Sequence, residues 1–310
     1  MLKIVVIGAI NWDVNFFVSR FPKKGEEIVV KKITRVPGGK AGNVAVAAAR
    51  LLGPNKVAIL GALGKDSIAN DQVKIFQTEG VVVDGLKLNP EVESGQAYIV
   101  IVDSGENLIH TYFGANATIM PEDLDAPERR KLISEASVVT IMDPPFETSL
   151  KLAREAKRLN KVVAWDPGVK SELGLEKTAG LLENISYVVA NESETEHLTG
   201  TTDHESAVKK FQEINGDLKF IAKLGSKGSI LYHRKDRLSG DPLDLHLHGL
   251  KVANTVGCGD AFIGAFVAAL SEGRSDVEAM KWANCAGGLK AARAETRGSP
   301  DRETLLRYVR

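Results

Sequence analysis

The feature that most constrains the fold is a regular alternation of short apolar runs with helix-like segments. Continuous apolar runs of this length are typical of strands that are buried on both faces of a parallel sheet. The alternation therefore predicts an α/β protein with a mostly parallel central sheet flanked by helices. The apolar runs occupy residues 3–7, 56–60, 136–142, 161–165, 186–190 and 220–224.

Polar side chains stand where several of these runs end. Asp143, Asp166 and Asn191 each follow an apolar run directly, and Glu194 lies one helical turn beyond Asn191. Parallel sheets bind ligands outside the carboxyl ends of their strands. Turn chemistry alone accounts poorly for this distribution of acidic and amide groups, so we expect a ligand site at that edge.

The first apolar run, residues 3–7, is followed by Gly8 and then by Asn11 and Asp13. No G-x-G-x-x-G pattern follows it, and no G-x-x-x-x-G-K-[ST] pattern occurs in the chain, which disfavours a dehydrogenase and a Walker P-loop. Residues two apart in an extended segment face the same way, so Asn11 and Asp13 could reach a polyhydroxylated ligand together. The alternative is a turn stabilised by both side chains.

A glycine-rich segment opens a helix of small residues. Gly38, Gly39 and Gly42 surround Lys40 and precede Asn43. Glycines allow a ligand to approach the backbone closely. Lys40 and Asn43 would bring a cation and an amide to that ligand.

A second glycine-rich segment lies near the C-terminus. Gly257 and Gly259 flank Cys258, and Asp260 follows at the start of an apolar helix over residues 261–270. Successive backbone N–H groups at a helix start form an anion site. An anion site with a carboxylate at its edge suits phosphoryl transfer to a hydroxyl, because the N–H groups hold the phosphoryl group and the carboxylate accepts the proton. The alternative is an ordinary helix start with an acidic residue in its first turn.

Two further polar groups each admit a structural and a functional interpretation. Asn191 and Glu194 form the pattern of a capping box, and with the carboxylate of the C-terminal glycine segment they could instead hold Mg²⁺ through water. Asp244, His246 and His248 alternate, which favours an exposed edge strand over a transition-metal site.

The composition sets the remaining bounds. The 310 residues are 44% hydrophobic, which suits one large domain or two small ones. The chain has 40 basic and 40 acidic residues, so nothing indicates a nucleic-acid partner. No apolar run approaches transmembrane length, which excludes a membrane partner of that kind. Cys258 and Cys285 lie far apart, which favours a reducing, cytoplasmic location.

Taken together, these motifs resemble the ribokinase, or PfkB, family of carbohydrate and nucleoside kinases. The resemblance covers essentially the whole chain, with the motifs in the family's order. Residues 38–43 are similar to the family's N-terminal signature, and residues 254–260 are similar to its C-terminal signature, usually written DTxGAGD. The resemblance implies a single ribokinase-like domain, residues 1–310, with a small β-sheet lid built from about residues 15–36 and 93–113.

The resemblance also implies roles for the site residues. Asp260 would be the catalytic base, and the N–H groups of Gly257, Cys258 and Gly259 would form the anion hole. Asn284 would lie against the adenine. The other implied contacts are Asn11, Asp13, Gly39, Lys40, Asn43 and Asp143 with the sugar, Asn191, Lys223, Gly225 and Gly228 with the nucleotide, and Asn191 and Glu194 with Mg²⁺ through water.

The implied activity is phosphoryl transfer from ATP or ADP to a hydroxyl of a ribose-like pentose or furanose. A nucleoside, or a phosphosugar such as ribose 1-phosphate, stays open as the acceptor, with Lys40, Lys170 or a lid lysine as the extra cationic contact. The alternative of another class is a non-catalytic nucleotide or sugar sensor, but a sensor would not need Asp260.

Two expectations concern partners of the implied kinase. Many family members carry Asp where this chain has Asn254, and that carboxylate helps to bind an activating potassium ion, so the neutral amide weakens the case for a monovalent cation here. Exposed strand edges in the lid predict a homodimer.

Overall fold

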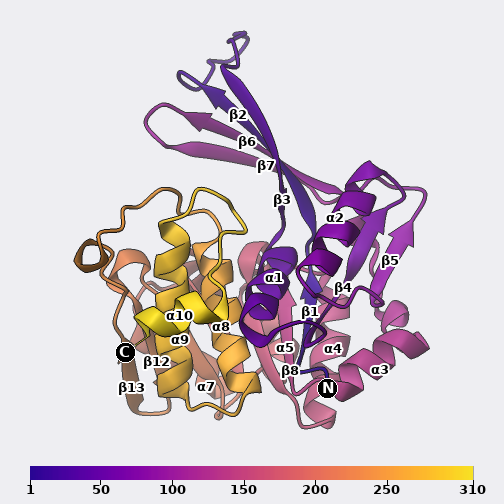
Figure 1. Cartoon of the computed structure of the whole chain (residues 1–310). Helices are drawn as coiled ribbons and strands as arrows, with labels where there is room; N and C mark the ends of the chain where they lie inside the picture. The colour runs from indigo at the N-terminus through magenta and orange to yellow at the C-terminus, as the bar shows by residue number, and fades with distance from the viewer. Residues whose placement is uncertain (310) are drawn as a thin grey trace.

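The computed structural model describes residues 1–309 and contains two sheets, the larger of which has nine strands (Figure 1). Its neighbouring strands are parallel except where β12 joins β11 and β13. This arrangement confirms the predicted mostly parallel central sheet. From edge to edge, the strands are β13 (Asp236–Gly240), β12 (Ser229–His233), β11 (Lys219–Lys223), β10 (Tyr187–Ala190), β9 (Val162–Asp166), β8 (Val138–Met142), β1 (Ile4–Gly8), β4 (Val57–Gly64) and β5 (Leu86–Asn89).

Helices cover both faces of the large sheet, and alternate residues of each strand face the two resulting cores. Ile4 and Val6 belong to one core, whereas Val5 and Ile7 belong to the other. The first core is closed by α1 (Lys40–Leu52), α2 (Ser67–Thr78), α8 (Cys258–Ser271), α9 (Asp276–Ala291) and α10 (Arg302–Tyr308). The second is closed by α3 (Pro127–Glu135), α4 (Phe146–Arg158), α5 (Gly174–Leu182), α6 (Glu192–Thr199) and α7 (His204–Ile214).

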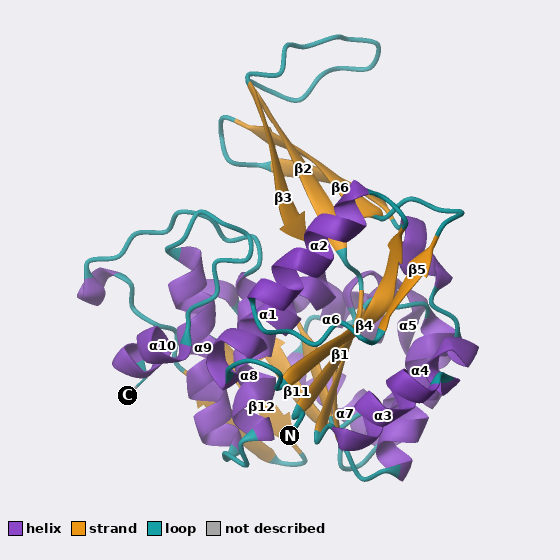
Figure 2. Ribbon diagram, turned by 45° about the vertical axis from the view of Figure 1, so that its right-hand side comes forward, coloured by secondary structure: helices purple, strands orange, loops and turns teal. Residues whose placement is uncertain are grey.

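The smaller sheet projects away from the body of the protein (Figures 1 and 2). Its order is β3 (Lys32–Gly38), β2 (Asn11–Val18), β6 (Gly95–Val102) and β7 (Asn107–Tyr112). Two antiparallel pairs, β2 with β3 and β6 with β7, are joined by parallel pairing of β2 with β6. The strand β2 begins at Asn11, just after β1, so the small sheet starts before the predicted lid segment at residue 15.

The two glycine-rich segments start two helices that pack together. Gly39 precedes α1 with φ 86°, and Gly257 precedes α8 with φ 84°, a region that L-residues resist. A Cβ on Gly264 of α8 would collide with Ala47 of α1, so the two helices are in intimate contact. This packing brings the two helix starts to the same edge of the large sheet.

The interpretation of Asp244, His246 and His248 as an edge strand is wrong. His246–His248 is a single turn of 3₁₀-helix, and the Asp244 carboxylate accepts the N–H of His246 at 2.9 Å. No group of three or more His, Cys, Asp or Glu side chains that could hold a metal ion occurs within residues 1–309. Over the same residues, no helix is both long enough and apolar enough to span a bilayer.

Candidate active site

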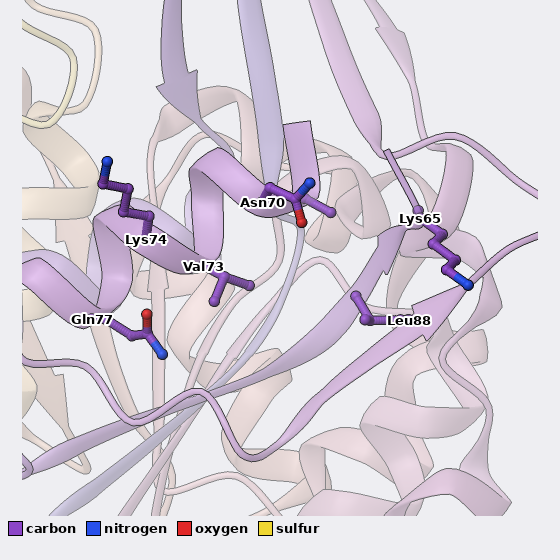
Figure 3. Close-up of a pocket in the computed structure, with 8 residues that line it drawn as sticks. Lys65, Asn70, Val73, Lys74, Gln77 and Leu88 are labelled. Carbon is purple, nitrogen blue, oxygen red and sulfur yellow. The ribbon is translucent and has the colours of Figure 1, made fainter. Parts of the chain in front are cut away.

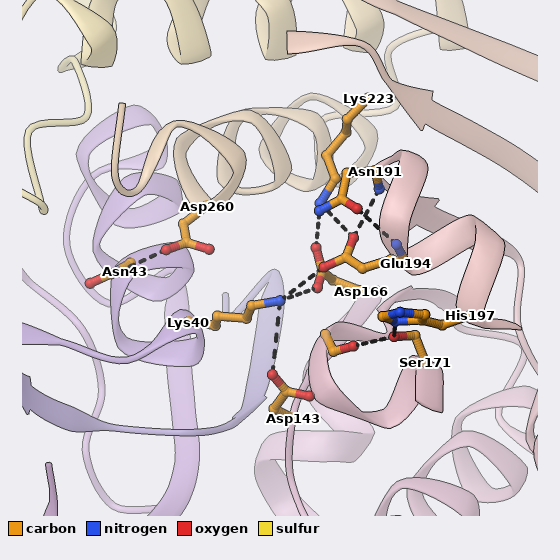
Figure 4. Close-up of polar contacts among 11 residues, drawn as sticks. Lys40, Asn43, Asp143, Asp166, Ser171, Asn191, Glu194, His197, Lys223 and Asp260 are labelled. Carbon is orange, nitrogen blue, oxygen red and sulfur yellow. Dashed lines mark hydrogen bonds and ion pairs between the residues drawn. The ribbon is translucent and has the colours of Figure 1, made fainter. Parts of the chain in front are cut away.

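Neighbouring parallel strands deliver charged side chains to one edge of the large sheet. Lys223 ends β11, Asn191 follows β10, Asp166 ends β9 and Asp143 follows β8. Their side chains, together with Lys40 at the start of α1, turn toward one another in Figure 4. The structure thus brings the strand-end residues of the sequence analysis into one cluster.

Asp166 is the centre of this cluster. Its carboxylate is 2% exposed and accepts from Lys40 Nζ at 2.7 Å and from Lys223 Nζ at 2.6 Å. Burial alone would raise the pKa of Asp166, but the two ammonium groups lower it below its ordinary value. The carboxylate therefore carries its charge at neutral pH and fixes both lysines.

Glu194 serves two purposes at the start of α6. Its carboxylate accepts the N–H of Asn191 at 2.9 Å, while the Asn191 side chain accepts the N–H of Glu194 at 2.8 Å, so the capping box is formed. The same carboxylate lies 3.3 Å from Lys40 Nζ and 3.5 Å from Lys223 Nζ. The cap therefore holds an acidic group at the site.

The pKa values of both lysines are raised although both are largely enclosed. Burial alone would lower the pKa of Lys40, yet the surrounding carboxylates, Asp166 first, raise it well above its usual range. Asp166 and Glu194 likewise outweigh burial for Lys223. Both side chains are thus fixed cations at the strand edge.

Asp260 lies in the first turn of α8 and is oriented by α1. Asn43 Nδ2 donates to its carboxylate at 2.7 Å. Protein atoms enclose Asp260, although part of its surface stays open to solvent. Burial raises the pKa of its carboxyl, and the hydrogen bond from Asn43 opposes that rise. A fixed carboxylate with a raised pKa is suited to accept a proton from a hydroxyl.

The start of α8 carries donors without protein acceptors. Within residues 1–309, the N–H groups of Gly257 and Gly259 donate to no protein atom. The Cys258 N–H differs from expectation, because it donates to the Thr255 carbonyl at 3.2 Å. Burial raises the pKa of the Cys258 thiol, which disfavours an activated thiolate at this position. Gly257 and Gly259 are thus the available members of the predicted anion hole.

Two further carboxylates, Asp143 and Asp13, are buried near this cluster. Asp143 lies 3.8 Å from Lys40 Nζ, whereas the charged neighbours of Asp13 are Arg297 and Asp260. Asp143 has φ 62°, and its Oδ1 has no hydrogen-bond partner within residues 1–309. Burial raises the pKa of Asp143 to about 6 and that of Asp13 to about 7. Asn11 is buried beside them and accepts from Asn116 Nδ2 at 2.8 Å. A desolvated carboxylate oxygen without a hydrogen-bond partner, such as Asp143 Oδ1, favours a ligand that donates hydrogen bonds.

Arg297 is a residue of this site that the sequence did not indicate. Its Nε donates to Asn43 Oδ1 at 3.0 Å, and its Nη2 donates to the Gly38 carbonyl at 2.8 Å. Arg297 therefore fixes the amide that orients Asp260. Only the fold brings it there, because it lies in a C-terminal loop without a recognisable motif.

The remaining residues predicted at the nucleotide lie farther along the same side of the sheet. Gly225 has φ 60° in a short 3₁₀ turn, and Gly228 has φ 85° where a Cβ would collide with the Gly240 carbonyl. Asn284 Nδ2 donates to Ser229 Oγ at 2.8 Å and to the Met280 carbonyl. The Asn284 amide is therefore engaged within the protein, and Gly228 is required by strand packing.

Two cavities contain none of the predicted site residues. The first, between α2 and β5 with a volume of about 260 Å³, is lined by residues such as Val73, Lys74 and Leu88 (Figure 3). The second, about 280 Å³, lies against α9 and α10 and is lined by residues such as Met280 and Tyr308. Neither combines an acid, a base and an anion-binding helix start, so the strand edge is the candidate active site.

A parallel sheet with free N–H groups at a helix start and a carboxylate at its edge is typical of an α/β phosphotransferase. The model of the pfkB family of carbohydrate kinases matches residues 1–302, and the chain belongs to that family. It is a phosphotransferase that acts on a sugar hydroxyl. The predicted ribokinase-like fold and family are thereby confirmed.

Three similar proteins illustrate the relationship. The ribokinase of Lactococcus lactis is 31% identical over 300 residues, which cover 96% of this chain and 93% of the relative. An ATP-dependent ribose-1-phosphate kinase of Halopiger xanaduensis is 28% identical, with 100% of this chain and 98% of the relative covered. The structure of Arabidopsis thaliana ribokinase complexed with ribose and ATP has a TM-score of 0.85 at 26% identity, covering 100% of this chain and 99% of that one.

Proposed function

We propose that this protein transfers the terminal phosphoryl group of a nucleotide, ATP in the first instance, to a hydroxyl of a ribose-like pentose. The observation that carries the proposal is the position of Asp260, which Asn43 holds at 2.7 Å beside the free N–H groups of Gly257 and Gly259. The similar ribokinases, one of them complexed with ribose and ATP, support this choice of substrates.

In this proposal Asp260 accepts the proton of the acceptor hydroxyl. The hydroxyl oxygen forms a bond to phosphorus while the bond from phosphorus to the nucleotide oxygen breaks, and the nucleotide leaves as ADP. A carboxylate is a weak base toward a free alcohol, but in a loose transition state the proton leaves late, when the hydroxyl is already acidic. The burial that raises the pKa of Asp260 also narrows the difference between the pKa of this carboxyl and that of the acceptor hydroxyl.

Phosphate would be bound by the start of α8, by Lys223 and by Lys40, which was instead expected at the sugar from the sequence. The N–H groups of Gly257 and Gly259 would hold the transferring group. Lys223 Nζ would lie only 3.7 Å from a Cβ on Gly259, so this ammonium is directed at the same place. Gly225, Gly228 and Asn284 would line the path of the nucleotide.

The residues near the lysines fit Mg²⁺. Asp166 and Glu194 offer carboxylate oxygens, and Mg²⁺ typically takes one or two carboxylates together with water and substrate phosphates. Asn191 already uses its amide oxygen in the cap, so it would reach the ion only through water. Bound Mg²⁺ would neutralise charge on the phosphates. Glu194 and Asp166 would hold the ion, and Lys40 and Lys223, which now pair with these carboxylates, would contact the phosphates of the nucleotide.

The acceptor would bind on the other side of Lys40. Among residues 1–309, Asp143 Oδ1 has no hydrogen-bond partner, and Asp13 is buried, so each can accept a hydrogen bond from a sugar hydroxyl. Gly39 and Asn11 would lie against the sugar backbone. The small sheet carries Asp13 and would close over the sugar as a lid that excludes water.

A phosphosugar is the second candidate acceptor. Lys170 Nζ lies 5.7 Å from the centre of the Phe113 ring at the lid, and its charge lowers the pKa of Asp143. A cation there could take a phosphate on the sugar, and the Halopiger relative is a ribose-1-phosphate kinase. A nucleoside would place its base under the lid instead.

A matrix assay tests these choices. Purified protein with Mg²⁺ is incubated with ATP or ADP against ribose, ribose 1-phosphate, fructose phosphates and common nucleosides, and the phosphorylated product is followed. Strong turnover with ATP and ribose supports the proposal. Strong turnover only with ribose 1-phosphate or only with a nucleoside would identify that compound, instead of ribose, as the acceptor. Nucleotide binding with no product in any combination would move the assignment to a non-catalytic sensor.

A homodimer and a cytoplasmic location complete the proposal. Strand β7 is exposed along its whole length at the edge of the small sheet, with Leu108 50% and Ile109 54% exposed. Such an edge can pair with that of a second copy. Light scattering after gel filtration should give twice the 33.4 kDa of one chain, and a monomer mass would contradict the dimer. Both cysteines are free thiols, which supports a reducing compartment.

A further inference from the structure

A lysine in the interior lies against the anion-binding turn without an acidic partner. Lys290 stands in the last turn of α9 and is 0% exposed. Its ammonium donates to the main-chain carbonyl of Asn254 at 2.8 Å and to that of Arg293 at 3.3 Å. Within residues 1–309 it forms no ion pair. A buried cation without an ion-pair partner is costly, and burial lowers the pKa of Lys290, with the charges of Glu295 and Asp260 opposing that effect. Its presence at this position therefore points to a function.

The two carbonyls belong to segments that shape the start of α8. Asn254 lies just before the anion-binding turn, and its side-chain amide donates to the Ala294 carbonyl at 2.8 Å. Gly257 packs against this assembly, because a Cβ there would collide with the Thr296 carbonyl and lie 3.5 Å from Lys290 Cε. Lys290 therefore ties the loop before α8 to the loop after α9, directly beneath the donors of the anion hole.

The surroundings of the ammonium resemble those of a free monovalent cation. Main-chain carbonyl oxygens are the ligands with which proteins replace the hydration shell of K⁺. The C-terminal end of α9 adds the negative end of a helix dipole, which favours a positive charge. A lysine side chain brings that charge on a covalent tether, so no ion has to be captured from solution.

We propose that Lys290 is a built-in monovalent cation, which holds the Asn254 and Arg293 carbonyls together and positions the N–H groups of Gly257 and Gly259 for phosphate. The inference rests on the proposed phosphoryl transfer at this site. Lys290 is a positioning residue, because it acts through the loop and does not touch the substrates. The wild-type enzyme should therefore need no added K⁺ or NH₄⁺.

The competing explanation is that Lys290 only caps the end of α9. A simple cap would contribute to thermal stability but would leave nucleotide affinity insensitive to the choice of salt. The two explanations therefore differ in the response to monovalent cations, and not in whether removal of the lysine lowers the melting temperature.

The test compares the wild type with Lys290→Met in choline chloride, KCl and NH₄Cl at equal ionic strength. ATP affinity is measured by calorimetry, and kcat and KM are measured with the acceptor found active. The wild type should vary by less than about twofold across the salts. Lys290→Met should lose about tenfold or more in ATP affinity and kcat in choline, as expected for a disturbed anion hole, and should regain activity in KCl or NH₄Cl.

Lys87→Met is the matched control. Lys87 Nζ also donates to a main-chain carbonyl, that of Thr118 at 2.9 Å, but it lies on β5 and pairs with Asp123. This variant should bind ATP like the wild type in every salt. Lys290→Gln replaces the Met variant if the latter does not fold, as judged by circular dichroism.

Three results would overturn the inference: activation of the wild type by K⁺, unchanged ATP affinity in the folded Lys290 variant, or a loss that no monovalent cation reverses. ATP affinity needs no acceptor, so it separates this inference from the proposed function. If the wild type binds ATP but phosphorylates no sugar or nucleoside, the proposed function fails while the salt response of binding still decides the role of Lys290.

Discussion

The two sides of the active site treat charge in opposite ways. On the phosphate side, formed by Lys40, Lys223, Asp166 and Glu194, every charged group faces an opposite charge within 3.5 Å. On the proposed acceptor side, Asp13 and Asp143 are buried, and the nearby charges of Arg297 and Lys40 do not outweigh the effect of burial on their pKa values. Asp143 Oδ2 lies 3.8 Å from Lys40 Nζ, and its Oδ1 has no partner within residues 1–309.

The difference in charge pairing between the two sides is reflected in the pKa values of their carboxyl groups and indicates which ligand each side suits. Burial acts on all of these carboxyls, but ammonium groups reverse its effect on Asp166 and do not reverse it on Asp143 or Asp13. An incoming phosphate must therefore compete with carboxylates for the lysines, and bound Mg²⁺ would relieve that competition. A sugar bound at the proposed acceptor side would instead donate hydrogen bonds to carboxylate oxygens such as Asp143 Oδ1.

The largest effect is expected at Asp260, where the two sides meet. Asp260→Asn keeps the size of the side chain but removes the proton acceptor, so kcat should fall by about 10³-fold with little change in nucleotide affinity. Single-turnover kinetics and calorimetric ATP binding measure the two quantities. Comparable turnover in the variant would show that Asp260 is not the base.

Asp166→Asn tests the paired side. The substitution leaves Lys40 and Lys223 without their shared countercharge, so the free energy of unfolding should fall by about 3 kcal/mol. Urea denaturation measures this loss, with Glu192→Gln on the exposed start of α6 as the control. An unchanged midpoint would mean that the pairs contribute no net stability and that the contrast between the two sides is one of geometry only.

The pH dependence of stability tests the unpaired side through Asp13. Its pKa is raised from 3.8 to about 7 in the folded protein, so the folded state binds its proton more tightly than the unfolded state does. The stabilisation that the raised pKa of Asp13 adds to the free energy of unfolding is complete below about pH 4 and is lost as the pH rises through 7. Between pH 5 and pH 8, the free energy of unfolding of the wild type should therefore fall relative to that of Asp13→Asn, by about 2 kcal/mol.

Urea titrations of both proteins at several pH values provide the comparison, since titrating groups that do not interact with Asp13 act equally in the two, and Asp260 and Arg297 are its charged neighbours. Asp103→Asn is the control, because Asp103 is exposed and, within residues 1–309, forms an ion pair only with Lys31 at the surface. A constant difference between wild type and Asp13→Asn across this range would show that the Asp13 carboxyl is not desolvated in solution.

The smallest effect is expected from Asp143→Asn. An amide can still accept a hydrogen bond from a sugar hydroxyl but does so more weakly than a carboxylate, so KM for the acceptor should rise about tenfold. Nucleotide affinity should stay the same, because Asp143 lies on the acceptor side. A change in ATP affinity would instead assign Asp143 to the phosphate side with Lys40 and Lys223, and would contradict the division of the site into a phosphate side and an acceptor side.

The sequence was sufficient for the features that depend on local patterns. Apolar runs and the polar residues after them predicted the parallel sheet, and since parallel strands end at one edge, Asp143, Asp166 and Asn191 were expected near one another. The two glycine-rich segments marked the starts of α1 and α8, because each needs a backbone conformation that favours glycine.

The sequence was insufficient where distant segments decide the geometry. Arg297 and Lys290 lie outside every motif, and their partners Asn43 and Asn254 come from other parts of the chain. The Cys258 N–H is taken by a local turn that depends on how the preceding loop is held. Alternation at Asp244, His246 and His248 was misleading, because an Asp side chain that accepts nearby N–H groups favours a turn over a strand.

The strand β2 connects the proposed acceptor site at Asp13 to the projecting small sheet. This strand starts at Asn11, beside the end of β1, and runs through Asp13 out to Val18 in the projecting sheet. With the acceptor bound at Asp13 as proposed, this one strand would contact the acceptor near its first residues and carry the lid at its far end. A small displacement at Asp13 would then become larger at the far end, so binding of the acceptor, and not of the nucleotide alone, would promote closure of the lid.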